Sequence, residues 1–435
     1  MRPDKTVQEA LQACFTFDIA MIKLLRVTFC LASLLNPSTI TGSAATEVAE
    51  QAMLPPAALM RYFGYNVEVH NVTTADGYIL EVDRMRSNST SNATTTRTPL
   101  LLVHGLLTNA ATWTANLPDQ SPGFLLADAG FDVWLVNTRG VPQSNRHVNL
   151  TTNDTEFWKW SFEQIGTYDL PAVIDYILNK TNFTKVGLLT TSQGTTASLV
   201  LLSMRPKYND KVNILVGYAP VANVTHFTSP MRFLIPFSKP VKVVNDFFTH
   251  GGFLVSNDVR QKKIAQMCDH SSLHNLCYMP LALLYGKNPK QYNSTRVPVY
   301  VANLPVGSSS QNVLHYAQMY KAKNFIRFDY GEKNNTVIYN QTHPPPYPLE
   351  SITVPLAIYQ GQGDIFANPQ DVHDLAERLR CILLVNETVP DPQFGHLDFI
   401  YGYNATETLH RHMIDIVKNC TTNGTDCRSF IPVLV

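Results

Sequence analysis

Charged residues are scarce in this chain of 435 residues. Asp, Glu, Lys and Arg make up 16% of it, against roughly 25% in soluble globular proteins. The 34 basic and 34 acidic residues cancel, so the chain lacks the basic surplus of nucleic-acid binders and we expect no nucleic-acid partner. Because 45% of the residues are apolar, the composition also excludes the disordered class. A chain of this length can bury a large core, but something other than charge must keep its surface hydrated.

Apolar runs of membrane-spanning length are also lacking. The N-terminal run, residues 22–35, contains two basic residues and is shorter than the ~20 residues that a transmembrane helix needs. We therefore expect no transmembrane segment. Small residues just before position 46 fit the cleavage site of a signal peptide over residues 1–45. Met21 is a second possible start, which would make residues 1–20 an upstream extension. An amphipathic N-terminal helix is the alternative interpretation.

Asparagine is used in a way that explains the hydrated surface. Fifteen Asn residues begin an N-x-[ST] sequon, and random placement would give only about a third of that number. The excess predicts a glycosylated product of the secretory pathway, either secreted or lysosomal. The candidate sites are Asn71, Asn88, Asn92, Asn149, Asn153, Asn179, Asn182, Asn223, Asn293, Asn334, Asn340, Asn386, Asn404, Asn419 and Asn423.

Cysteine is sparse, and two of the seven cysteines fall in the predicted signal peptide. The other five divide most simply into two close pairs and one single residue. Each pair would close a short loop as a disulfide, and the single cysteine precedes an apolar run, so we expect a buried thiol there. Zinc binding is the alternative, but neither pair has C-x-x-C spacing, and we expect no metal. The pairs are Cys268 with Cys277 and Cys420 with Cys427, and the single residue is Cys381.

Short apolar runs rich in β-branched residues alternate with segments of helical spacing. This alternation predicts an α/β fold with a mostly parallel, doubly wound central sheet covered by helices on both faces. The expected strands are Leu100–Val103, Phe131–Val136, Val186–Thr190, Ile214–Tyr218, Pro355–Tyr359 and Ile382–Val385. The expected helices are Gly123–Ala129, Tyr168–Ile177 and Thr195–Met204, and the Ser/Thr/Asn-rich stretch 87–98 is expected to be a loop or hairpin tip.

A long interval interrupts this rhythm and predicts an inserted domain. We expect residues 46–220 to form the first part of the core, residues 221–351 a cap or lid, and residues 352–418 the second part of the core. Residues 419–435 would form a C-terminal tail. No internal repeat is found.

Ser192 lies between an apolar strand and a helix of small residues in the run LLTTSQGTTASL. A nucleophile elbow, G-x-S-x-G, requires this context, because a sharp turn between strand and helix exposes the Ser hydroxyl. Gly194 fits the pattern, but Thr190 stands where the first Gly belongs. The motif alone is weak, and a Ser that merely starts a helix is the alternative.

Asp364 and His396 provide the partners that a nucleophilic Ser needs. Each follows an expected strand, and the chain order Ser, Asp, His is that of the α/β-hydrolase triad. The rival carboxylates are Asp371, Asp374 and Asp398, whereas His373, His410 and His412 are expected to be solvated helix positions.

The run His104-Gly-Leu-Leu follows the expected strand at residues 100–103. Hydrolases of this type contribute one oxyanion N–H from this position. We expect the backbone N–H groups of Leu106 and Gln193 to form the oxyanion hole. Without the predicted Ser, Asp and His residues, this run would be interpreted as an ordinary turn between a strand and a loop.

Several longer stretches have no generic meaning. They include YFGYNVEVHNVTTADGYILEVDRM, HGLLTNAATWTANLPDQSPGFLLADAGFDVWLVNTRG, FWKWSFEQIGTYDLPAVIDYI, YNSTRVPVYVANLPVGSSSQN and GHLDFI. With them, the chain resembles the acid lipases of the gastric and lysosomal type, within the α/β-hydrolases, from about residue 62 to residue 417. The resemblance implies Ser192 as nucleophile, Asp364 and His396 as its partners, and Leu106 with Gln193 as the oxyanion pair. It also supports the Cys268–Cys277 disulfide.

Two features depart from the pattern of that family. The family normally reads G-H-S-Q-G, whereas this chain has Thr190 and Thr191 in the first two places. The β-branch of Thr190 must either shift the elbow or be accommodated by a neighbour, and Thr191 is expected to alter substrate fit. The C-terminal extension with Cys420 and Cys427 is the second departure.

The expected cap contains a dense apolar stretch over residues 227–255. Exposed on opening, it would form the kind of apolar patch that a lipid surface binds. The alternative is that these residues only pack the cap onto the sheet. The expected lipid contacts are Phe233, Leu234, Phe237, Phe247 and Phe248.

These features predict a serine lipase that hydrolyses triacylglycerols, cholesteryl esters or both through an acyl-enzyme. We expect a lipid substrate at an oil–water or membrane surface, no cofactor, and a monomer. The alternatives are a non-catalytic lipid-binding, yolk-like protein on the same fold, a short-chain carboxylesterase and a peptidase.

Overall fold

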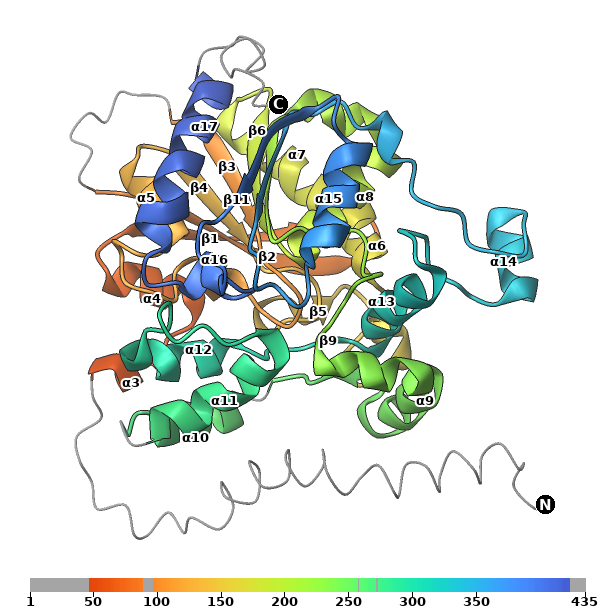
Figure 1. The fold of residues 1–435 in the computed structure, drawn as a ribbon, viewed down its shortest axis with the longest axis horizontal. Coiled ribbons are helices and arrows are strands. Elements are labelled where there is room, and N and C mark those ends of the chain that lie inside the picture. The colour runs from red at the N-terminus through yellow and green to blue at the C-terminus, as the bar shows by residue number, and fades with distance from the viewer. Residues whose placement is uncertain (1–46, 89–96, 257, 271–272, 423–435) are drawn as a thin grey trace. The chain divides into compact units, whose positions relative to one another are not determined.

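The computed structural model describes residues 47–422 apart from 89–96, 257 and 271–272. Within this part of the chain, nine strands form one sheet in the order β1-β2-β4-β3-β6-β7-β10-β11, with β5 beside β2 (Figure 1). The strands are β1 (Asn66–Thr73), β2 (Tyr78–Arg86), β3 (Pro99–Val103), β4 (Asp132–Val136), β5 (Arg146–His147), β6 (Val186–Thr191), β7 (Val212–Tyr218), β10 (Leu356–Gln360) and β11 (Leu383–Thr388). The predicted signal peptide lies outside the described residues.

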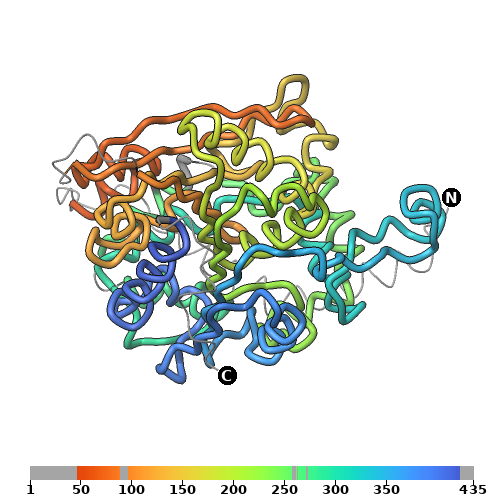
Figure 2. The backbone as a smooth tube through the Cα atoms, turned by 90° about the horizontal axis from the view of Figure 1, so that it is seen from above, coloured from red at the N-terminus to blue at the C-terminus, as the bar shows by residue number. Residues whose placement is uncertain are grey.

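The centre of the sheet is parallel and fully covered. Every residue of β3, β4 and β10 is buried, as continuous apolar runs require when helices cover both faces. Helices α5 (Pro122–Asp128) and α17 (Arg411–Thr422) lie on one face, and α7 (Leu170–Thr181) and α8 (Gln193–Met204) lie on the other (Figures 1 and 2). The predicted fold is confirmed, and the six predicted strands are present with ends shifted by at most three residues.

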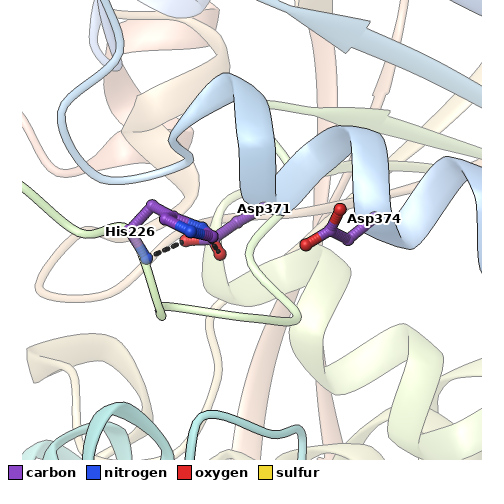
Figure 3. Close-up of side chains that lie close together, drawn as sticks. All are labelled: His226, Asp371 and Asp374. Carbon is purple, nitrogen blue, oxygen red and sulfur yellow. Dashed lines mark hydrogen bonds and ion pairs between the residues drawn. The ribbon is translucent and has the colours of Figure 1, made fainter.

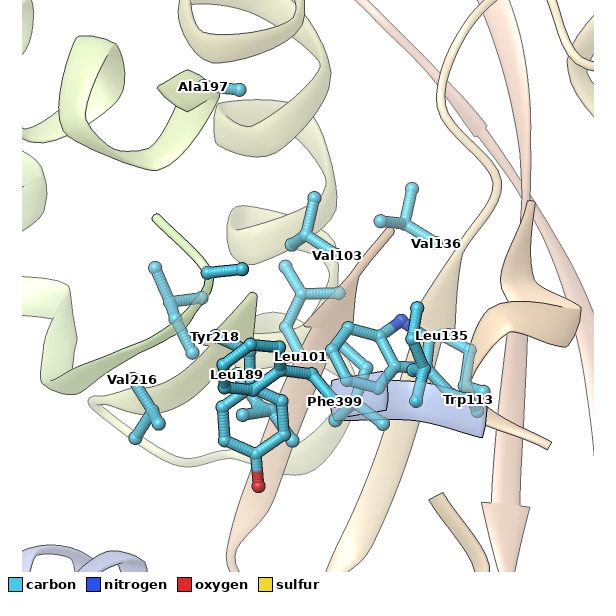
Figure 4. Close-up of a cluster of buried hydrophobic side chains, with 14 of the residues drawn as sticks. Leu101, Val103, Trp113, Leu135, Val136, Leu189, Ala197, Val216, Tyr218 and Phe399 are labelled. Carbon is cyan, nitrogen blue, oxygen red and sulfur yellow. The ribbon is translucent and has the colours of Figure 1, made fainter. Parts of the chain in front are cut away.

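Side chains from several strands form the main core. Leu101, Leu135, Leu189 and Val216 project from four neighbouring strands and pack with Phe399, which lies on α16 (Asp398–Tyr401) (Figure 4). All five are 1% exposed or less. This packing holds the end of β6, which Ser192 directly follows, in a fixed position.

The antiparallel hairpin β1–β2 is not among the predicted strands. It pairs Asn66–Thr73 with Tyr78–Arg86 and joins the parallel centre through β4. Buried and exposed residues are mixed along β1 because it is an edge strand. A search for continuous apolar runs therefore passes over it.

Asp83 on β2 is a carboxyl group in an apolar sheet. It is 0% exposed, and among the described residues only Asn137 offers it a side-chain donor, at 3.5 Å. Burial, with a smaller contribution from Glu81, raises the pKa of Asp83 to about 8. The folded protein therefore keeps Asp83 protonated at acidic pH.

We expect Asp83→Asn to stabilise the fold at alkaline pH. In the unfolded chain Asp83 ionises near pH 4, but in the folded chain only near pH 8, so its contribution to stability falls as pH rises between these values. Asn cannot ionise. Urea unfolding at pH 4 and pH 8 should show a variant about 1–3 kcal/mol more stable than wild type at pH 8, with no such gain at pH 4. An equal effect at both pH values would contradict this account.

The chain between β7 and β10 is mostly helical and spans the residues that are predicted to form the cap. It holds a short antiparallel pair, β8 (Gly252–Phe253) with β9 (Ser308–Ser309). Its main helices are η7 (Pro230–Phe237), α9 (Ser238–Thr249), α10 (Asp258–Cys268), α11 (His274–Tyr285), α12 (Val297–Asn303), α13 (Ser310–Ala322) and α14 (Glu332–Tyr339). In Figure 1, α9 to α13 lie together at one end of the sheet, and α14 stands apart. Within the described part of the chain, no helix combines the length and apolar character needed to cross a bilayer.

Candidate active site

Ser192 forms a sharp turn between β6 and α8. Its φ of 51° and ψ of −118° are rare for a residue with a side chain. Its backbone N–H donates to Tyr218 O on β7 at 3.0 Å, which fixes the turn to the sheet. A Cβ at Gly194 would lie 2.3 Å from Val103 O, so only glycine lets α8 begin this close to β3. The local geometry is that of a nucleophile elbow.

Thr190 is accommodated by hydrogen bonds. Its hydroxyl donates to Val216 O at 2.9 Å and lies 2.8 Å from the Thr195 hydroxyl. Gly217, its partner on β7, makes room, because a Cβ there would lie 3.1 Å from Thr195 Cγ2. The β-branch therefore fits without distorting the contact between strand and helix.

We expect Thr190→Val to destabilise the fold by about 1–3 kcal/mol, because it leaves a buried carbonyl and a buried hydroxyl without their partner. Thr190→Ser keeps the hydroxyl and should cost less. Urea unfolding of both variants tests this, and a valine variant as stable as wild type would refute the role of the hydroxyl.

His396 and Asp364 complete a hydrogen-bonded chain with Ser192. The Ser192 hydroxyl lies 2.8 Å from His396 Nε2, and His396 Nδ1 lies 2.8 Å and 3.1 Å from the two carboxylate oxygens of Asp364. Asp364 also accepts the backbone N–H groups of Phe366 and Ala367, each at 2.8 Å. His396 and Asp364 are 4% and 3% exposed, so their interaction is poorly screened by water.

The Gly-rich loop after β10 allows this approach. A Cβ at Gly361 would lie 2.2 Å from Phe394 O. Glycine therefore lets the loop carrying Asp364 pass close to the segment that precedes His396.

The rival carboxylates have other partners. Asp398 accepts the backbone N–H of Gly395 at 2.7 Å, and burial raises its pKa to about 7. Asp371, on α15 (Pro369–Arg378), accepts a hydrogen bond from the backbone N–H of His226 at 2.9 Å, and its other carboxylate oxygen lies 2.9 Å from His226 Nδ1. Asp374 lies one turn farther along α15, with no bond to that pair (Figure 3). None of the three is hydrogen-bonded to His396 among the described contacts.

His410 corrects one prediction. It was expected to be solvated but is 0% exposed, with Nδ1 at 3.1 Å from the Tyr218 hydroxyl. Burial lowers the pKa of His410 to about 3. It belongs to η11 (Thr406–His410), a π-helical turn that shifts the helical register and places His410 inside. His373 and His412 are exposed as expected.

Two backbone N–H groups lie beside Ser192. Gln193 follows it directly, and the loop of Leu106 passes close by, since a Cβ at Gly105 would lie 3.2 Å from Ser192 Cβ. Among the described residues, neither the Leu106 nor the Gln193 N–H has a hydrogen-bond acceptor. Both therefore remain available to an oxygen atom bound near Ser192.

His104 and Asn312 support these two groups, and no sequence motif marks Asn312. His104 Nε2 accepts the Thr138 N–H at 3.1 Å, so Nδ1 donates to Gly105 O at 2.8 Å. Burial lowers the pKa of His104 to about 4, which keeps it neutral. Asn312 on α13 donates to Gln193 Oε1 at 2.7 Å and is 0% exposed.

An apolar cavity of about 180 Å³ opens onto Ser192 and His396. Its walls come from η7, α9, α13 and the end of α11 together with loops around Ser192, and they include Leu106, Thr191, Leu234, Tyr285, Tyr316 and Phe366. The Tyr285 ring stacks on His396 at 6.0 Å between centroids and on Phe366 at 5.0 Å. The cavity thus suits an apolar ligand with one polar group at Ser192.

The other predicted sites are distributed as follows. Cys268 and Cys277 form a disulfide. Cys427 lies outside the described residues, so its pairing with Cys420 stays a prediction. Cys381 is exposed and not buried as expected, because it lies in the turn before β11 and its side chain does not share the burial of Ile382.

The sequons lie mainly on the surface. Asn92 and Asn423 lie outside the described residues, Asn223 and Asn293 are half-buried, and the other eleven are exposed.

The sheet order and the elbow define an α/β-hydrolase. A family profile described as "alpha/beta hydrolase fold" matches residues 98–403, and one described as "Partial alpha/beta-hydrolase lipase region" matches residues 57–117. Among solved structures, a monoglyceride lipase of Saccharomyces cerevisiae shares the fold at a TM-score of 0.50, with 12% identity, over 82% of this chain and 96% of that one.

Two relatives narrow the class. Gastric triacylglycerol lipase of Bos taurus is 36% identical over 84% of this chain and 92% of its own. Lysosomal acid lipase/cholesteryl ester hydrolase of Homo sapiens is 34% identical over 91% of this chain and 99% of its own. The chain belongs to the family of gastric and lysosomal acid lipases, and it is a carboxylic ester hydrolase.

Proposed function

We propose that this chain is a lipase that hydrolyses triacylglycerols, cholesteryl esters or both through a Ser192–His396–Asp364 triad. The observation that carries the proposal is the unbroken hydrogen-bonded chain from Ser192 to Asp364 at the edge of an apolar cavity. His396 takes the Ser192 proton as the hydroxyl oxygen attacks the ester carbonyl. Asp364 holds the imidazole with Nδ1 protonated, which leaves Nε2 as the proton acceptor.

The Leu106 and Gln193 N–H groups stabilise the oxyanion of the tetrahedral intermediate. Loss of one such donor typically costs ~3 kcal/mol in the transition state. The intermediate collapses when His396 returns the proton to the leaving alcohol. Water, deprotonated by the same His396, then hydrolyses the acyl-enzyme and releases the fatty acid.

A movable lid within residues 221–351 controls entry of the lipid. The cavity of about 180 Å³ is below the ~300–1,000 Å³ of most ligand sites, so a long-chain ester enters only when η7 and α9 move outward. Leu234 already lines the cavity, whereas the other expected lid contacts are exposed, Phe247 by 80% and Phe248 by 74%. Thr191, which also lines the cavity, contributes to substrate fit.

A short-chain carboxylesterase is the second candidate, favoured by the small cavity. A comparison of emulsified triolein, cholesteryl oleate, a soluble butyrate ester and a peptide separates the two. We expect turnover of at least one emulsified lipid above that of the butyrate ester, and none of the peptide. Turnover of the butyrate ester alone would contradict the lipase and favour the second candidate.

We also propose a mature chain that begins near Thr46, carries glycans on many of its sequons and works as a monomer outside the cell or in the lysosome. The surface position of eleven sequons supports this route.

A further inference from the structure

Helix α11 is an exposed helix without charged side chains. Its sequence, HNLCYMPLALLY, contains no Lys, Arg, Asp or Glu, and among its residues only Leu281 is buried. Leu276, Met279 and Leu283 are 38%, 46% and 47% exposed. Their spacing of three and four residues places them on one face, which we call the α11 stripe. An exposed apolar stripe on an uncharged helix is unusual for a surface in contact only with water.

The C-terminal end of α11 adjoins the proposed lid and the active-site cavity. Tyr285 ends α11, lines the cavity and stacks on His396. Next to it, Leu284 O accepts the Ser229 hydroxyl at 3.0 Å, which joins α11 to the start of η7. Figure 1 places the helix that carries the stripe at the same end of the sheet as α9.

Unlike the proposed lid, α11 is anchored. The Cys268–Cys277 disulfide ties it to α10, and the Tyr278 ring lies 4.0 Å from that of Tyr292. The Tyr292 hydroxyl in turn donates to His274 O at 3.1 Å. By contrast, α9 has no buried residue. The α11 stripe thus has a fixed position beside the lid, which the proposed function requires to move.

No sequon begins within η7, α9, α10 or α11. The longest interval between successive sequons runs from Asn223 to Asn293 and covers η7, α9, α10 and α11. The apolar pair Val337 and Ile338 on α14, 85% and 50% exposed, instead lies between the sequons Asn334 and Asn340. Glycans at these two positions would keep a broad surface away from α14, whereas α11 itself carries no sequon.

We propose that the α11 stripe is a fixed lipid anchor, which seats the protein on a lipid surface beside the lid. Leu276, Met279 and Leu283 insert among the acyl chains, and the exposed Lys287 and Lys290 that follow α11 lie at the level of the lipid phosphates. This inference rests on the proposed lipase function, because a lipase must bind the surface that holds its substrate. Binding to that surface can nevertheless be measured without catalysis.

The test compares one triple variant and one double variant in full-length glycosylated protein. Leu276→Ser, Met279→Ser and Leu283→Ser together remove the stripe, and Val337→Ser with Ile338→Ser removes a matched exposed pair on α14. Each is combined with Ser192→Ala, so that no hydrolysis occurs, and its flotation with phosphatidylcholine-coated triolein droplets is measured. The same sets in the Ser192 protein are assayed on a soluble butyrate ester.

The stripe variant should bind droplets roughly tenfold to a hundredfold more weakly than the Ser192→Ala parent, while the α14 variant binds as the parent does. None of the three stripe residues lines the cavity, so hydrolysis of the soluble ester should be unchanged. Equal droplet binding by the stripe variant would overturn the anchor and leave the lipase proposal intact. A dimer in light scattering that the stripe variant converts to monomer would overturn it in favour of a second copy of the chain. If wild type hydrolyses no ester, the proposed function fails, whatever the droplets show.

Discussion

Replacing Ser192 by alanine should lower the turnover of every ester substrate by about 10⁴-fold or more, because loss of the nucleophile of a triad removes the acyl-enzyme route entirely. The substitution deletes one oxygen atom, which lies 2.8 Å from His396 Nε2. It should not weaken the fold, because the N–H of residue 192 still donates to Tyr218 O. Measurement of kcat on a soluble butyrate ester and on emulsified triolein checks both substrate classes.

The control for this variant is its stability. Its unfolding midpoint in urea should match wild type, so that lost activity cannot be assigned to lost structure. A folded Ser192→Ala protein with more than about a hundredth of wild-type kcat would remove Ser192 from the mechanism, since a triad serine contributes far more than that.

Arg139→Met should destabilise the fold by about 3–5 kcal/mol, because it leaves a buried carboxylate without its counter-charge. Arg139 and Asp169 are 1% and 0% exposed. The Arg139 guanidinium donates to Asp169 at 2.6 Å and 2.8 Å and to Asp76 at 2.7 Å and 2.9 Å, and it lies 3.9 Å from the Tyr78 ring centroid. It thereby joins the chain after β4 to η5 (Ile165–Asp169) and to the β1–β2 turn.

Arg411→Met is the matched control, because its pair with Glu407 is exposed to solvent and such pairs contribute little. Urea unfolding of both variants should show a large loss for Arg139→Met and no measurable loss for Arg411→Met. A small loss for Arg139→Met would mean that water or another cation reaches Asp169.

The proximity of Ser192, Asp364 and His396 could be expected from the sequence, because Ser192 directly follows β6, Asp364 lies in the loop after β10, and His396 lies in the segment after β11. The C-terminal ends of parallel strands meet at one edge of a sheet, so residues far apart in the chain come together there. The hydrogen-bonding distances between these three side chains could not be expected from the sequence. They depend on Gly361, whose lack of a side chain lets two backbone segments nearly touch.

Other features depend on tertiary contacts that no local pattern encodes. Asn312 lies 119 residues from Gln193, and no motif marks a buried amide on α13 as its partner. His410 carries the polar signature of a surface residue, but the π-helical turn at η11 rotates it into the core. From the sequence, the β-branched side chain of Thr190 is expected to crowd the contact between strand and helix at the elbow. It fits because its strand partner is Gly217 and its hydroxyl is hydrogen-bonded to that of Thr195.

The most direct test of the account is covalent labelling of the protein with a long-chain fluorophosphonate, followed by proteolysis and mass spectrometry. A phosphonate mimics the tetrahedral intermediate, so it reacts only with a Ser that is activated by a base and faces oxyanion donors. We expect one adduct, on the peptide that contains Ser192, with loss of ester hydrolysis in proportion to labelling and no adduct in Ser192→Ala. An adduct at another residue, or full labelling of Ser192 with hydrolysis retained, would contradict the proposed mechanism.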